Sequence, residues 1–152
     1  MRLPLVSTAL LLSLSFPCAH AFGTRGIDVS DAAGIAQLEI RADHADAREQ
    51  CFLYTELVHL YTELAGKQLA AGETTQASAT LKRVQHFAER IHLGLARDTK
   101  RLKNAEILMH NASFHLGEYR RLVSSEDQEM VQATRKQLDM LNDELLAQVF
   151  AH

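Results

Sequence analysis

The residues of this chain most suited to chemistry form two copies of the spacing Glu-x-x-His: Glu56 with His59, and Glu89 with His92. In helical bundles that bind two metal ions, this spacing puts a carboxylate and an imidazole one turn apart, both facing the bundle interior. Gly72 lies almost midway between the copies, so a helical hairpin bent there would bring them to the same height. A metal-binding helical bundle is therefore one hypothesis.

The surrounding pattern favours another interpretation. The first copy belongs to a run of polar residues at helical spacing, opposite a stripe of leucines: Glu56, His59, Glu63 and Lys67. Such a run is typical of a solvent-exposed helix face with a Glu63–Lys67 pair. Glu89 falls on the outward side of the next predicted helix, and His92 flanks its apolar seam. Because these side chains mostly point away from each other, we predict an interaction or structural module, with the metal-binding bundle as the alternative.

Motifs of other chemistries do not occur in the sequence. It has no Gly-x-Ser-x-Gly nucleophile elbow, no glycine-rich phosphate loop and no Cys-x-x-Cys-His haem attachment motif. We therefore expect no catalysis and no cofactor.

The first residues have the features of a signal peptide. Arg2 is followed by an apolar run through Phe16, and Ala19-His20-Ala21 has the small-x-small form of a cleavage site. We predict a signal peptide over residues 1–21, cleaved after Ala21, and an exported protein that is periplasmic or secreted. A lipoprotein acylated at Cys18 is the alternative. No later stretch is apolar for long enough to predict a transmembrane segment after signal cleavage.

Cleavage at that site leaves a chain with one cysteine, Cys51, and no proline. A lone thiol in an oxidising compartment has no partner for an intrachain disulfide. Three interpretations stay open: a small buried apolar residue, an intermolecular bridge or a reactive nucleophile.

The remaining pattern predicts an all-α fold, an antiparallel helical bundle or set of helix hairpins. Residues 22–34 contain three glycines among small and acidic residues and predict a flexible leader, while residues 35–152 predict a single helical domain. Asp46 with Glu49 forms a capping box that starts a helix, and Gly72 ends it. Ser125 begins a similar box before a last helix.

Between these boundaries, an apolar heptad seam predicts a long central helix over residues 74–123. Steps of three and four connect Leu81, Val84, Ala88, Ile91, Leu95, Asp98, Leu102, Ala105, Met109, Ala112, Leu116, Tyr119 and Val123. The one charged member, Asp98, follows Gly94 and could cap a new helix, so a break near residues 94–99 is equally compatible with the sequence.

Charge is divided along the same boundaries. Residues 76–122 contain nine basic and four acidic side chains, whereas both flanking segments are acidic. We expect this basic segment to pair with the acidic helices of the same chain or to face solvent. We do not expect nucleic acid as a partner.

Three apolar residues share the heptad position opposite the seam: Leu93, Ile107 and Phe114. If the long helix is exposed there, they form a patch of about 30 Å that could bind a protein partner or a second copy of the chain.

Two stretches resemble known groups of proteins. The segment YTELAGKQLAAGETTQASATLKRV resembles a tetratricopeptide helix pair in its order of small and large residues around Gly72, although the usual closing proline is missing. That resemblance implies a helix hairpin and protein binding. The segments CFLYTELVHLYTELAG and ARDTKRLKNAEILM look like a group of exported bacterial helical proteins, which implies no particular activity.

Overall fold

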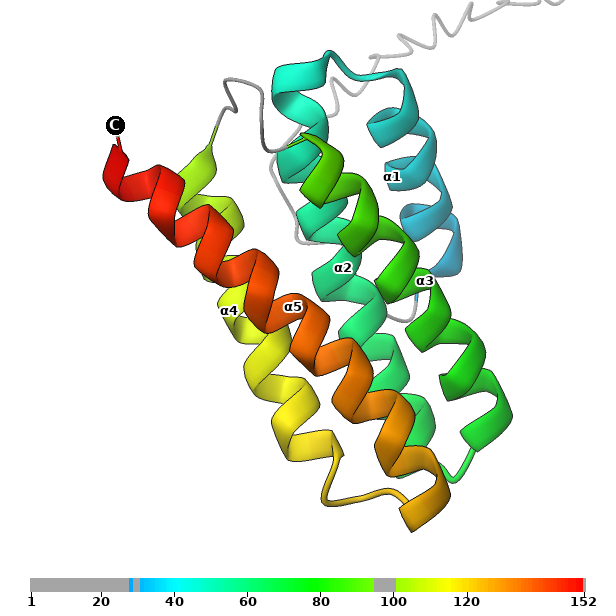
Figure 1. Ribbon diagram of the computed structural model, residues 1–152. Helices are drawn as coiled ribbons and strands as arrows, with labels where there is room; N and C mark the ends of the chain where they lie inside the picture. Colours follow the sequence, from blue (N-terminus) through cyan, green and yellow to red (C-terminus); the bar gives the residue numbers. More distant parts are fainter. Residues whose placement is uncertain (1–27, 29–30, 95–100, 152) are drawn as a thin grey trace, which may run out of the picture.

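The computed structural model describes residue 28, residues 31–94 and residues 101–151, and this part of the chain is all-α (Figure 1). Its five helices are α1 (Ala32–His44), α2 (Ala47–Ala70), α3 (Thr74–Gly94), α4 (Leu102–Tyr119) and α5 (Ser125–Ala151). The prediction of an antiparallel helical bundle is confirmed. The predicted signal peptide and most of the predicted leader lie outside the described residues.

The central segment consists of two helices. α3 ends at Gly94 and α4 begins at Leu102, and the proposed cap Asp98 lies outside the described residues. The chain enters α4 through Arg101, whose φ of 59° is left-handed. The guanidinium of Arg101 lies 3.6 Å from the centre of the Phe52 ring, and this cation–π contact holds the start of α4 against α2.

Two antiparallel hairpins, α2 with α3 and α4 with α5, lie side by side (Figure 1). Gly72 closes the first hairpin with a φ of 77°, and Glu73 N donates to Gln68 O in the pattern of a Schellman motif. Contacts between the hairpins follow the same residue order on both helices of a pair: residues later in α2 contact residues later in α4, and the same holds for α3 and α5. α2 is therefore parallel to α4, and α3 is parallel to α5. α3 and α4 lie diagonally opposite each other in the bundle and do not pack side by side within the described residues.

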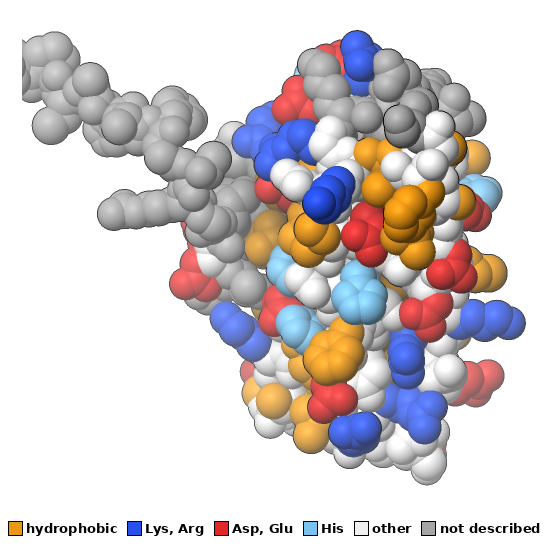
Figure 2. All heavy atoms as spheres, turned by 90° about the vertical axis from the view of Figure 1, so that its left-hand side faces the viewer, with side chains coloured by type: hydrophobic (Ala, Val, Ile, Leu, Met, Phe, Trp, Pro, Cys, Tyr) orange, Lys and Arg blue, Asp and Glu red, His pale blue; other side chains and the backbone are white. Residues whose placement is uncertain are grey.

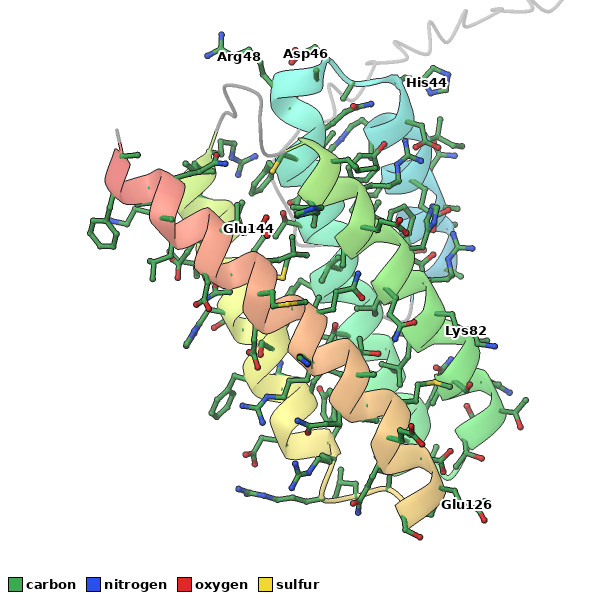
Figure 3. The ribbon with its side chains drawn as sticks, viewed as in Figure 1. His44, Asp46, Arg48, Lys82, Glu126 and Glu144 are labelled. Atoms are coloured by element: carbon green, nitrogen blue, oxygen red, sulfur yellow. The ribbon has the colours of Figure 1, made fainter. Side chains whose placement is uncertain are left out.

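The helix starts follow local hydrogen bonding. Asp46 caps α2 as predicted, accepting from the backbone N–H groups of Arg48 and Glu49. The end of α1 and the start of α2 lie at one end of the molecule, where Figure 3 labels His44, Asp46 and Arg48. α5 is capped by Ser124, one residue before the predicted cap, because the Ser124 hydroxyl lies 3.4 Å from Asp127 N.

α1 begins earlier than the pattern predicted. The Asp31 side chain accepts from Gly34 N, so residues 32–34 are helical rather than part of a flexible leader. Ile35, Leu38 and Ala42 on this helix are buried, and α1 packs on α2 outside the two hairpins.

Most of the predicted apolar seam lies in the core where the structure describes it, whereas Leu102, Tyr119 and Val123 are partly buried at the edge of the core. The seam residues Val84 and Ile91 of α3 and Met109 and Leu116 of α4 are fully buried. The other two helices of the hairpins contribute equally buried residues: Leu57 and Val58 of α2, and Leu138 and Leu145 of α5. No described helix has the length and apolarity needed to cross a membrane.

Candidate functional site

The two Glu-x-x-His motifs belong to different helix interfaces. Glu56 lies next to α1, where Arg41 Nη2 is 3.4 Å from Glu56 Oε2. His92 lies next to α5, and its Nδ1 is 2.8 Å from Glu144 Oε2; Figure 3 labels Glu144 on that helix. Glu89 borders the same groove between α3 and α5 as His92. The fold therefore does not bring the two motifs to one metal ion.

The predicted solvent face of α2 is partly covered. Glu56, His59 and Glu63 are half-buried because α4 packs along that side of α2. Lys67 does not pair with Glu63; its Nζ lies 4.0 Å from Asp28 Oδ1. The prediction of an exposed face with a Glu63–Lys67 pair was wrong at these positions, since the sequence does not show that a second hairpin covers the polar side of α2.

This contact between α2 and α4 forms a polar cluster of His59, Glu63, His115 and Tyr119. His115 Nδ1 is hydrogen-bonded to Glu63 Oε1, and the His59 and His115 rings are 6.4 Å apart between centres. The Tyr119 ring lies 6.2 Å from His115. Pale blue histidine side chains are visible beside apolar ones in the middle of the face shown in Figure 2.

Burial changes the ionisation of this cluster. The pKa of His59 is lowered because burial disfavours its charged form, an effect partly opposed by Glu63 and reinforced by His115. Burial and the neighbouring Glu63 raise the pKa of Tyr119 to about 12. His59 Nδ1 is buried without a hydrogen-bond partner among the described residues. Burial in this cluster therefore favours the neutral form of His59. The bond between Glu63 and His115 joins α2 to α4.

None of the acidic and histidine clusters in the described segments has a geometry that would hold a metal ion through three or more His, Cys, Asp or Glu side chains. The metal-binding alternative therefore gains no support from the placement of Glu56, His59, Glu89 and His92.

The basic segment pairs with the acidic first helix. Arg83 of α3 bonds to Glu39 of α1, and Arg90 Nη1 lies 3.2 Å from Asp43 Oδ1. Beneath these pairs lie tyrosine rings: Arg90 is 4.5 Å from the centre of the Tyr54 ring, and the Tyr54 hydroxyl donates to Asp43 at 3.2 Å. The predicted pairing of the basic segment with an acidic helix of the same chain is therefore present between α3 and α1. These ion pairs join the two helices across α2.

The three predicted partner-binding residues are all exposed, at 71% for Leu93, 45% for Ile107 and 59% for Phe114. They do not form one stripe, however. Leu93 is on α3, whereas Ile107 and Phe114 are on α4, and these helices lie diagonally opposite each other. The predicted continuous patch depended on an unbroken central helix, so the break separates Leu93 from the other two residues.

α5 adds two exposed apolar residues to the α4 side of the molecule, Leu146 at 37% and Phe150 at 82%. Ser113 on α4 bonds to Asp139 on α5, and Arg120 bonds to Gln132; continuing this antiparallel register brings Leu146 and Phe150 beside the first turns of α4. Figure 2, which turns α4 toward the viewer, shows a cluster of apolar side chains in the upper part of this face.

We call this surface the outer α4 face: Ile107 and Phe114, with Leu146 and Phe150 at its α5 edge. Leu146 and Phe150 were not predicted from the sequence as part of this surface. A signal for Phe150 was present, because it lies off the buried stripe of Leu138, Leu141 and Leu145 and follows Leu146 at helical spacing.

Cys51 is buried, with 2% of its surface exposed. Burial raises the pKa of its thiol to about 11. A buried, protonated thiol is a weak nucleophile and an inaccessible disulfide partner, which favours the first of the three interpretations, a small apolar core residue.

No protein-family profile, no curated protein and no solved structure matches this chain.

Proposed function

We propose that this chain is an exported helical module that acts by binding a protein through the outer α4 face, without catalysis. The observation that carries the proposal is the exposure of Ile107 and Phe114 on a helix whose opposite side, at Met109 and Leu116, is fully buried. A single exposed leucine is ordinary on a protein surface, whereas large apolar side chains gathered on one face are typical of an interaction site.

The arrangement of the helices is compatible with this role. The two hairpins pack side by side, with α2 parallel to α4 and α3 parallel to α5. This packing leaves the outer side of α4 uncovered by the other described helices. The α2–α3 hairpin contains the segment that resembles a tetratricopeptide helix pair, and proteins with that repeat bind other proteins. Export is supported by the signal-like residues 1–21.

The polar groups support a structural rather than a catalytic role. Glu63 bonds to His115 between α2 and α4, Arg90 bonds to Asp43 between α3 and α1, and His92 bonds to Glu144 between α3 and α5. Each pair connects two helices, so these side chains have an evident part in holding the fold together.

A binding experiment on the mature protein tests the proposal. The wild-type protein and the variant Ile107→Glu are immobilised and exposed to the exported fraction of the source cells, and self-association is measured in parallel. Met140→Glu is the matched control, because Met140 is 53% exposed and borders the α3–α5 groove, away from the outer α4 face. Circular dichroism verifies that all three proteins are folded.

We expect Ile107→Glu to lose the captured protein or the self-association, and Met140→Glu to keep it. A carboxylate at Ile107 stays solvated in the free protein but would be buried without a partner in a complex. Equal binding by both variants and the wild type would contradict the proposal.

A further inference from the structure

The outer side of α4 has a self-complementary order of residues. One side of the helix carries Lys103, Ile107, Phe114 and Glu118, with His110 and Asn111 on either side of its middle. The steps along this series are four, three, one, three and four residues, so the order of spacings is the same from either end. Read from either end, this side has a charged residue, a large apolar residue, a polar centre, a large apolar residue and a charge of opposite sign.

We propose that the partner of the outer α4 face is a second copy of this chain, bound with the two α4 helices antiparallel about a two-fold axis between His110 and Asn111. This inference rests on the proposed function, since it names the partner of the same surface. The two-fold axis brings Ile107 against the partner's Phe114 and Lys103 against the partner's Glu118. Because of the two-fold symmetry, each of these contacts occurs twice in the dimer.

Charge selects the antiparallel arrangement. A parallel pairing in register would put Lys103 against the partner's Lys103 and Glu118 against the partner's Glu118, and like charges across an interface are unfavourable. In the antiparallel pairing both ends carry an opposite-charge pair. Lys103 is exposed. The Glu118 side chain is 49% exposed, and its other contact, with Arg121 at 3.4 Å, is an exposed pair that leaves Glu118 accessible to the partner's Lys103.

The α5 edge enlarges the apolar contact. The register of α4 and α5 brings Leu146 and Phe150 beside the end of the face that contains Ile107, which is where the partner's Phe114 arrives. Phe150, at 82% exposure, and the aromatic ring of Phe114 each offer a large apolar area. Because the axis doubles every contact, the four apolar residues of the outer α4 face contribute eight side chains to the interface.

A charge exchange across the axis tests the proposal with the mature full-length chain. The variants are Lys103→Glu and Glu118→Lys, studied alone, as an equimolar mixture and combined in one chain. Both changes suit the helix dipole, because Lys103→Glu places an acid in the first turn of α4 and Glu118→Lys places a base in its last turn. If a variant loses the dimer, unfolding of α4 is therefore not the cause. Circular dichroism verifies that each variant keeps its helix content.

We expect the wild-type protein to be a dimer by sedimentation. Each single variant replaces two attractive contacts with two repulsive ones, which should raise the dimer dissociation constant by about tenfold. The mixture and the double variant should both restore dimers, since each again sets a lysine against a glutamate. Added salt should weaken the wild-type dimer and strengthen the single variants.

Three results would overturn the inference: a monomeric wild-type protein at the highest attainable concentration, dimers unaffected by either charge change, or a mixture that fails to restore association. Failure of the dimer proposal can be distinguished from failure of the proposed binding function. A monomeric protein that still captures a different protein, and loses it through Ile107→Glu, would keep the binding face and exclude the second copy as its occupant.

Discussion

The phenol ring of Tyr119 lies directly over the backbone of Gly66, so a β-carbon at Gly66 would overlap the ring atoms. This contact lets α4 approach α2 closely at the end of the polar cluster. Gly66→Ala should therefore destabilise the protein by about 1–3 kcal/mol through overpacking. Chemical denaturation monitored by circular dichroism measures the effect.

Gly117, in the last turn of α4, offers a control. A β-carbon there would lie 3.2 Å from Nη1 of Arg135, at the movable end of a long side chain. Gly117→Ala should be neutral or stabilise the protein by up to about 1 kcal/mol, from helix propensity. Adding Tyr119→Ala to Gly66→Ala should relieve most of the overlap, so additive effects of those two changes would contradict the packing account.

The buried imidazole of His59 should make the protein less stable in acid. Its pKa is lowered from the ordinary value of 6.5 by burial, so below pH 6.5 the unfolded chain binds a proton at this position more readily than the folded chain. Stability therefore falls as the pH decreases through and below 6.5. The groups that act on His59 are Glu63 on its own helix, which opposes the shift, and His115 on α4, which reinforces it.

Thermal unfolding at pH 7.5 and at pH 5.5 tests this expectation. His59→Gln removes the titrating group, so the loss of melting temperature between the two pH values should be smaller in the variant than in the wild type. His44→Gln is the control, because His44 is exposed at the end of α1. Identical pH dependence in wild type and His59→Gln would show that His59 does not titrate differently on folding.

The first helix should depend on its buried face. Leu38 is 2% exposed and Ile40, on the same helix, is 53% exposed. Leu38→Ala should cost about 2–5 kcal/mol by opening a cavity between α1 and α2, whereas Ile40→Ala should change stability by about 0.5 kcal/mol or less. Denaturation curves of the two variants give this comparison, and equal effects would mean that α1 is not packed as described.

The sequence predicts that the mature protein begins at Phe22, because alanine occupies both small-residue positions of Ala19-His20-Ala21. Mass spectrometry of protein recovered from the exported fraction should find a chain that starts at this residue. A lipid on Cys18, or an uncleaved chain retained inside the cell, would exclude that processing.

Local sequence determined the helices and most of their ends. Asp46 and Gly72 identify the limits of α2 because side-chain capping and a left-handed turn depend on a few neighbouring residues. Burial of the seam positions Met109 and Leu116 could also be predicted from the sequence. Apolar residues on the buried side of a helix repeat with the helical period, whichever neighbouring helix covers them.

Tertiary structure decided what each helix face touches. The run Glu56, His59 and Glu63 has the pattern of an exposed face, yet α4 covers part of it because the second hairpin packs against this side of α2. Likewise, Leu93 and Ile107 share a heptad position, but the break after Gly94 puts them on diagonal helices. Periodicity describes one helix at a time, whereas the pairing of helices depends on contacts between residues far apart in the chain.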